Sequence, residues 1–380
     1  MFSNRRVYLD NAAGVSGNPS SSHEEGRRAK DMLEDARTAI ARLIEVQPAD
    51  VIFTSGATES NALAILGHIR ALRMIGKNNM HVLYLPSAHA SIIENVRLLA
   101  AENVSIETLP IKGYRVDIEK LSGMVRKETA LISMDAVCGE TGVVWNTREV
   151  ADVLLTHNNK ESFSLTQGIT TMLHIDASQA PSTEKISRAH FGADLLTLDA
   201  SKVGNIRGIG ALIAHRTIPM ISLYKGGGQE RGLRPGSENP IAARDFAEAL
   251  GVAVRMREKF RTSAARERER LVGLIRNTVP NVFIQEGYSQ APHILNVSLL
   301  GRDTDYVVAL LDEAGFAVST RSACETDSEE GSRAVFALTG DLERARVTLR
   351  ISWGPKVRSC ELTRFAKALA RSVAFIDNNG

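Results

Sequence analysis

The segment from about residue 50 to residue 215 alternates short apolar runs with stretches of helical pattern. The apolar runs lie at residues 51–53, 81–85, 130–134, 173–175, 195–197 and 210–213. Short apolar runs interleaved with helices are typical of strands buried on both faces, because crossover helices cover both sides of a parallel sheet. We therefore expect an α/β fold with a parallel or mostly parallel sheet. Ligands of such sheets bind at the carboxyl ends of the strands.

A long helical stretch separates this segment from a second unit. Residues 239–279 carry apolar residues at helical spacing with no internal breaker, which predicts one long helix or two collinear helices. Further predicted elements are strands at 7–9, 293–299, 316–319 and 347–352, a helix at 305–314 and a terminal helix from about Glu361. A chain of 380 residues exceeds one simple core. We expect a large domain over residues 12–250 and a smaller α/β domain formed by residues 1–11 and 251–380.

The bulk composition excludes several classes of protein. The formal net charge of +2 favours neither nucleic acid nor an anionic membrane as a partner. No apolar run approaches the ~20 residues that cross a bilayer, and the N-terminus predicts no signal or transit peptide. The three cysteines, Cys138, Cys324 and Cys360, are widely spaced and predict neither a disulfide framework nor a metal site. We expect a cytoplasmic protein.

Asp176 and Lys202 each follow a predicted strand. An acid and an amine at neighbouring strand ends suit pyridoxal phosphate (PLP). The amine can hold the aldehyde as a Schiff base, while the acid keeps the pyridine nitrogen protonated. Each residue alone has an ordinary explanation, Asp176 as a turn cap and Lys202 as a surface lysine, so only the pair carries the prediction.

Three further features suit the same ligand. Residues 54–61 follow a strand and open a helix, where free backbone N–H groups can bind a phosphate, although a plain helix cap explains them alone. His89 lies beyond strand 81–85 and has a side chain that can stack on a ring and transfer protons, but a lone loop histidine is more often structural. Residues 226–237 contain five glycines, two arginines and Ser237, a loop of unusual dihedrals that suits an anion.

Seven motifs resemble those of cysteine desulfurases of the NifS/IscS type, which are class V aminotransferases of PLP fold type I. The motifs are residues 8–13, 17–23, 53–60, 139–144, 174–179, 226–237 and 322–324. They stand in family order with closely similar spacing, and the resemblance runs from about residue 7 to residue 375. The resemblance implies PLP as cofactor, a large domain with a mostly parallel seven-stranded sheet flanked by helices, and a smaller α/β C-terminal domain.

Carried over by position, the resemblance assigns roles to single residues. Lys202 would bind PLP covalently and later move protons, Asp176 would pair with the pyridine nitrogen, and His89, also catalytic, would stack on the ring. Other implied cofactor contacts are Gln179 at the ring hydroxyl, Ala57, Thr58, Cys138 and Ser201, with Arg350 and Cys138 at the substrate carboxylate. Ser237 would reach the cofactor phosphate of a second subunit, which implies a homodimer.

Cys324 matches the catalytic cysteine of the family. The resemblance implies that its thiolate attacks the sulfur of L-cysteine, which leaves a persulfide on Cys324 and releases L-alanine. The polar neighbours Arg321, Glu325 and Asp327 argue against an inert core thiol. We expect this residue on a loop that moves toward the cofactor.

The sequence departs from the family pattern near the cofactor. Cys138 stands in place of an asparagine, and Asp199 and Ser201 stand in place of a serine and a histidine that bind phosphate. A carboxylate repels a phosphate unless it is protonated, turned away or bridged by a cation. The stretch between Ala13 and Gly17 is also shorter than in the family, which usually has a helix there.

We expect a cysteine desulfurase that supplies sulfur for iron–sulfur clusters or tRNA thiolation through an acceptor protein that no motif identifies. The departures leave two alternatives open. One is a selenocysteine lyase or another class V lyase with an altered substrate. The other is a weakly active homologue that acts as a binding protein.

Overall fold

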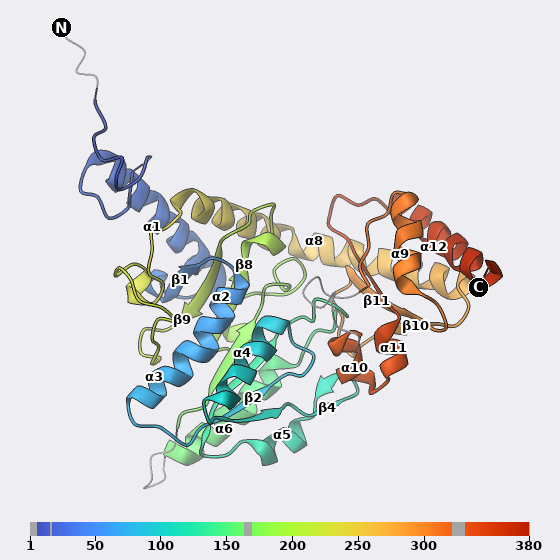
Figure 1. Ribbon diagram of the computed structural model, residues 1–380, viewed down its shortest axis with the longest axis horizontal. Helices are drawn as coiled ribbons and strands as arrows, with labels where there is room; N and C mark the ends of the chain where they lie inside the picture. The colour runs from blue at the N-terminus through green and yellow to red at the C-terminus, as the bar shows by residue number, and fades with distance from the viewer. Residues whose placement is uncertain (1–5, 16, 163–168, 321–330, 380) are drawn as a thin grey trace.

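The computed structural model describes residues 6–15, 17–162, 169–320 and 331–379 (Figure 1). A seven-stranded sheet covered by helices forms the larger part of the molecule. The long helix α8 (Pro240–Thr278) leads from it to a smaller unit around a three-stranded sheet. In the described part of the chain, no helix is long and apolar enough to cross a membrane.

The main sheet has one antiparallel strand among parallel ones. Its order is β1 (Val51–Thr54), β9 (Gly210–Ala214), β8 (Leu195–Asp199), β7 (Met172–Asp176), β6 (Thr129–Asp135), β2 (His81–Tyr84) and β3 (Ser105–Thr108). Strands β8 to β3 run parallel to one another, whereas β9 is antiparallel to both of its neighbours. Every residue of β1, β6 and β9 is buried, as helices on both faces require. The predicted mostly parallel seven-stranded sheet is confirmed.

The helices around this sheet have their apolar residues on the inner side. They are α1 (Glu24–Ile44), α2 (Ala57–Ala62), which continues through a π-helical turn (Leu63–Gly67) into α3 (His68–Met74), then α4 (Ala90–Ala101), α5 (Ile118–Met124), α6 (Thr147–Ser162) and α7 (Arg188–Phe191). Short 3₁₀ turns lie at Pro48–Asp50, Ala200–Lys202 and Glu230–Gly232, and β4 (Ile111–Lys112) pairs with β5 (Arg115–Val116) in a hairpin. In α1, Leu33, Ile40 and Ile44 are buried at helical spacing.

Helix α8 joins two apolar cores. It is a single helix of 39 residues, as predicted, and the Asn239 side chain caps its start by accepting a hydrogen bond from the Ala242 N–H (3.0 Å). Phe246 and Leu250 belong to the core of the main sheet, whereas Phe260 and Ile275 belong to the second core. This change of core along α8 supports a boundary near residue 250, which stays a prediction.

The second unit is built on an antiparallel sheet, β10 (Val282–Gln285), β11 (Ile294–Leu299) and β12 (Thr348–Ser352), in that order. Its helices are α9 (Thr304–Glu313), α10 (Arg333–Thr339), α11 (Leu342–Arg346) and α12 (Ser359–Asn379). The predicted strand at 316–319 is wrong. Only Ser319 pairs there, in an isolated bridge with Arg350, because its neighbours find no ladder partner.

The N-terminal residues lie beside the first turn of α1. The predicted strand at 7–9 is wrong, since this segment has no strand partner and its Leu9 side chain is exposed. Arg6 pairs with Glu24 and Glu25 at the first turn of α1. Within this chain, residues 6–11 therefore lie beside α1 and away from the C-terminal unit (Figure 1).

A buried ion pair fixes the glycine loop 226–237 to the main sheet. Arg37 of α1 donates from Nη1 and Nη2 to the two carboxylate oxygens of Glu230, at 2.8 and 2.7 Å. The backbone N–H of Phe53 in β1 donates to the same carboxylate at 2.8 Å, and the Arg37 guanidinium lies 4.8 Å from the centre of the Phe53 ring. Glu230 and Arg231 both have positive φ, 47° and 61°, which the surrounding contacts hold in place.

We predict that Glu230→Gln lowers the free energy of unfolding by about 3–5 kcal/mol, because it leaves the buried Arg37 charge with only the half-exposed Glu34 as an ion-pair partner. Urea denaturation at neutral pH measures the change. Glu258→Gln, which removes an exposed partner of Arg257, serves as the matched control and should change stability by less than about 1 kcal/mol. Equal effects of the two variants would contradict the structural role of Glu230.

Candidate active site

The carboxyl ends of five strands meet at one edge of the main sheet. The residues that follow β1, β2, β6, β7 and β8 line one cavity of about 310 Å³, and β12 of the C-terminal unit adds one side chain to it. The cavity brings together the predicted residues Lys202, His89, Asp176, Gln179, Ala57, Thr58, Cys138 and Arg350. Ligands of parallel sheets bind at this edge, so the cavity is the candidate active site.

Three predicted residues do not line this cavity. The Ser201 side chain faces an adjoining cavity of about 520 Å³, which shares Lys202 and Arg350. Ser237 lines a separate cavity, formed with residues 13–32 and 238–241. Cys324 lies outside the described residues, so its prediction is not tested by the fold.

Asp176 is the buried acid at the end of β7. Its carboxylate accepts one hydrogen bond from Asn61 Nδ2 (2.7 Å) and one from the Ser178 backbone N–H (2.9 Å). The two donors come from different segments and fix the orientation of the carboxylate. A charged carboxylate at this position is what a protonated pyridine nitrogen requires as its partner.

Asn61 extends this interaction toward His89. Its amide nitrogen also donates to Ser91 Oγ (2.8 Å), and Ser91 Oγ lies 2.8 Å from His89 Nδ1. The Ser91 backbone N–H donates to the same ring nitrogen (3.2 Å), so Nδ1 is an acceptor and the proton of the neutral ring resides on Nε2. A continuous chain of hydrogen bonds thus joins β7, α2 and α4. Sequence analysis did not find Asn61 or Ser91, although both stand inside or beside its motifs.

Asp135 is a second buried acid, one strand away from Asp176. The two residues are register partners at the ends of β6 and β7. Burial, and then the nearby Asp176 carboxylate, raise the pKa of Asp135 well above its ordinary value. Burial and the neighbouring acid thus disfavour the charged form of Asp135. No motif had indicated Asp135.

The cavity wall has unmet hydrogen-bonding capacity. Ser87 Oγ, Ser178 Oγ and Asp135 Oδ1 are buried and have no hydrogen-bond partner among the described residues. Buried polar atoms are normally paired, so a polar ligand fits between them. Together with the Lys202 amine and the Asp176 carboxylate, these atoms suit the substituted pyridine ring of PLP.

Arg350 enters the cavity from β12. Its backbone N–H and C=O both bond to Ser319, which fixes the residue at the edge of the sheet. Among the described residues, its guanidinium makes long hydrogen bonds, to Gly139 O (3.3 Å) and Ser319 Oγ (3.4 Å). These weak bonds can be exchanged for a bidentate pair with a substrate carboxylate.

Asp199 lines the cavity beside Ala57 and Thr58, at the start of α2. Its carboxylate accepts from the Ala57 N–H (2.9 Å) at the start of α2 and from the Ser201 N–H (2.7 Å). In the next turn Glu59 accepts from the Ser55 N–H (2.5 Å). Two carboxylates thus occupy backbone donors in the segment that the sequence predicts as a phosphate site.

The profile of the aminotransferase class-V family matches residues 6–365. The chain is 32% identical over 354 residues to the cysteine desulfurase IscS of Vibrio campbellii, with 92% of this chain and 83% of the relative covered. It is 30% identical over 339 residues to cysteine desulfurase IscS 1 of Archaeoglobus fulgidus, with 89% and 85% covered. The chain belongs to the class-V aminotransferases, in their cysteine desulfurase branch.

Solved structures agree with this assignment. A NifS-like protein superposes with a TM-score of 0.84 at 25% identity, covering 94% of this chain and 92% of that protein. DndA from Streptomyces lividans superposes with a TM-score of 0.73 at 28% identity, covering 90% and 94%. This desulfurase branch depends on PLP, which confirms the predicted family, fold type and cofactor.

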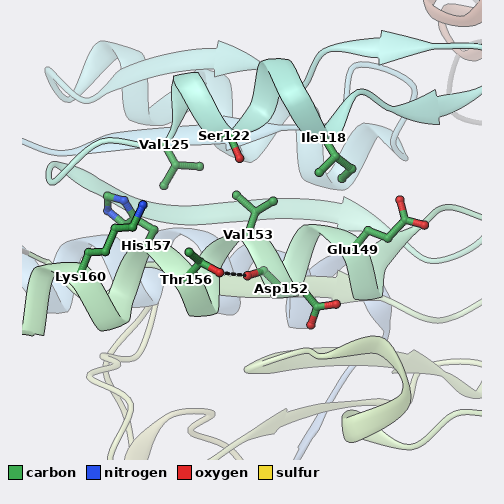
Figure 2. Close-up of a pocket in the computed structure, with 9 residues that line it drawn as sticks. All are labelled: Ile118, Ser122, Val125, Glu149, Asp152, Val153, Thr156, His157 and Lys160. Atoms are coloured by element: carbon green, nitrogen blue, oxygen red, sulfur yellow. Dashed lines mark hydrogen bonds between the residues drawn. The ribbon is translucent and has the colours of Figure 1, made fainter.

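A groove elsewhere on this desulfurase shares no lining residue with the Lys202 cavity. It has a volume of about 430 Å³ and lies between α5 and α6, where Ile118, Val125 and Val153 form its apolar wall (Figure 2). His157 and Lys160 of α6 border it, and Thr156 donates a hydrogen bond to the Asp152 carbonyl oxygen of the same helix.

Cys138 of the desulfurase is a buried thiol in the cavity wall. Its Sγ lies 4.0 Å from the Ser87 carbonyl oxygen, to which it donates. Burial, and then the carboxyl groups of Asp135 and Glu140, raise the pKa of Cys138 to about 12. At neutral pH it remains a thiol, so its chemistry differs from that expected of the nucleophile Cys324.

We predict that Cys138 resists alkylation in the folded protein. At pH 8 a thiol with a pKa of about 12 is ionised to only about one part in 10⁴, and burial blocks the reagent. Iodoacetamide should label only the exposed Cys360 in a Cys324→Ala variant, and should label Cys138 after unfolding in urea. Mass spectrometry identifies the labelled peptides. Native labelling of Cys138 at the rate of Cys360 would contradict this account.

Proposed function

We propose that the chain takes the sulfur of L-cysteine onto Cys324 as a persulfide, releases L-alanine and passes the sulfur to an acceptor protein. The observation that carries this proposal is the meeting of Lys202, Asp176, His89 and Arg350 around one cavity. Lys202 comes from the 3₁₀ turn after β8, Asp176 from the end of β7, His89 from the N-cap of α4 and Arg350 from β12. Each would supply a different group that the reaction needs.

PLP, when bound, supplies an aldehyde that takes up amino groups and a ring that accepts electrons. Lys202 would hold the aldehyde, Asp176 would face the pyridine nitrogen, and Gln179 would bond the ring hydroxyl. His89 would lie on the ring face, held through Nδ1 by Ser91. Ala57, Thr58 and Ser201 would lie near the phosphate, and Cys138 beside the ring.

Side chains of this protein would carry out the remaining steps. Arg350 binds the substrate carboxylate and so fixes the orientation of the amino acid. Lys202 moves the proton of the substrate Cα. The Cys324 thiolate attacks the substrate sulfur, the bond between that sulfur and Cβ breaks, and Cβ takes up a proton to become the methyl group of alanine. The sulfur atom remains on Cys324 as S–SH, so atoms and charge balance.

We propose a homodimer in which Ser237 of the partner subunit completes each site. Ser237 lines a cavity separate from that of Lys202 within one chain, which supports a role across an interface. Apolar side chains are exposed near it, with Leu9 at 89%, Val15 at 84% and Ile241 at 54% exposure. Burial of these side chains against a second copy would be favourable.

We propose a cytoplasmic location and an acceptor that is either an iron–sulfur scaffold protein or a tRNA thiolation enzyme. The persulfide would have to leave the cavity on Cys324 to reach either acceptor. Arg350 and Lys202 would have the same roles with selenocysteine as the substrate. A comparison of the rates with L-cysteine and selenocysteine therefore distinguishes a desulfurase from a selenocysteine lyase.

We predict that purified protein with PLP and a thiol reductant forms alanine and sulfide from L-cysteine in equal amounts. Lys202→Ala should lose both products by about 100-fold or more, since it removes the group that moves protons. Cys324→Ala should lose sulfide formation, whereas the control Cys360→Ser, at the exposed start of α12, should keep wild-type rates.

Alanine is measured by chromatography and sulfide by colorimetry. If Cys324→Ala released sulfide as fast as the wild type, the role of Cys324 would be wrong. A strong preference for selenocysteine would move the function to the lyase alternative.

A further inference from the structure

Asp199 occupies backbone donors at the end of the cavity where a phosphate is expected. The carboxylate bridges two segments, with Oδ2 accepting from Ala57 N–H (2.9 Å) and Oδ1 accepting from Ser201 N–H (2.7 Å). Both bonds have ordinary lengths for charge-assisted hydrogen bonds. The same side chain lines the cavity beside Lys202 and Thr58, so it faces the ligand as well as the backbone.

Close backbone packing holds the carboxylate in this position. A Cβ on Gly56 would meet Asp199 Oδ2 at 3.4 Å, and a Cβ on Gly210 would meet the Gly56 backbone at 2.8 Å. Gly56 also has a φ of 150°, which favours glycine. The segment before Ala57 is therefore pressed against β9 and β8, and the Ala57 N–H points at Asp199.

Nearby cations do little to offset this charge. Arg234 lies 3.6 Å from Glu59, whose carboxylate also accepts from the Tyr224 hydroxyl (2.7 Å) and from the Ser55 N–H. Part of the Arg234 charge is thus neutralised by an acid of the same segment. At this end, Asp199 and Lys202 line the cavity itself, whereas Glu59 and Arg234 are not among its lining residues.

We propose that Asp199 is an internal competitor of the cofactor phosphate and sets the cofactor specificity of this site. The carboxylate holds N–H groups that a phosphate would otherwise accept, and two anions on the same donors repel each other. The site thus gains little from the phosphate and discriminates weakly between PLP and pyridoxal, its unphosphorylated form. This inference rests on the proposed PLP site around Lys202.

The test is a titration of the cofactor-free protein with PLP and, separately, with pyridoxal. The absorbance change that depends on Lys202 reports binding, so no catalytic turnover is needed. We expect wild-type dissociation constants for the two compounds within about tenfold of each other, because a tenfold ratio corresponds to only one weak charged interaction. A wild-type preference for PLP of a thousandfold or more would overturn the proposal without any variant.

Two variants of Asp199 test whether this side chain weakens the binding of the PLP phosphate. Asp199→Ser frees the Ala57 N–H and removes the charge, and should tighten PLP binding by roughly tenfold or more while pyridoxal binding changes by less than about threefold. Asp199→Asn keeps a side-chain oxygen for the Ser201 N–H and removes only the charge, so it should give a smaller gain for PLP. Asp152→Asn, which removes an exposed acid of α6, is the control and should change neither constant.

The results of these titrations distinguish a failure of this inference from a failure of the proposed function. One such result is that the wild type binds both compounds while neither Asp199→Ser nor Asp199→Asn changes the ratio of the two dissociation constants. That result overturns the inference and leaves the proposed function standing. Equal tightening of PLP and pyridoxal also overturns it, since the phosphate would then not be the group that Asp199 opposes. A wild-type protein that binds neither compound at Lys202 overturns the proposed function together with the inference.

Discussion

The Asp176 carboxylate is the point on which the candidate site depends. It is buried at the end of β7, and Asn61 of α2 and the Ser178 backbone hold it with two short hydrogen bonds. Because the Asn61 amide also bonds Ser91, the position of His89 follows from that of Asp176. A buried charge must be fully hydrogen-bonded, and this requirement fixes three elements of the main sheet and its helices relative to one another.

Acids define both ends of the cavity. At the ring end, Asp135 and Asp176 are register partners, and burial beside Asp176 raises the pKa of Asp135. At the phosphate end, Asp199 takes backbone donors from Ala57 and Ser201. Lys202 lines the same cavity, and Arg350 reaches it from the C-terminal unit. The proposed site would therefore match the charges of an amino acid and a pyridine ring better than the charge of a phosphate.

Sequence patterns predicted six of the seven strands of the main sheet, because each of the six is a short apolar run. The edge strand β3 was missed, because its sequence Ser-Ile-Glu-Thr is mostly polar and none of its residues is fully buried. The strand ends then placed Asp176, His89 and Lys202 at one edge without knowledge of the strand order. The sequence did not indicate the order of the strands in the sheet. The pairing of Asp135 with Asp176 and the hydrogen bond from Asn61 to Ser91 therefore could not be predicted. The segments at 7–9 and 316–319 show the opposite error, since an apolar run forms a strand only where a partner is available.

The most direct test of the central claim is the absorbance spectrum of the protein with PLP, recorded before and after L-cysteine is added, for the wild type and for Lys202→Ala. The account predicts a cofactor band in the wild type that shifts when L-cysteine binds and that is missing in the variant. A wild-type spectrum that equals that of free PLP, or a band that L-cysteine leaves unchanged, would contradict a cysteine desulfurase and favour a binding protein.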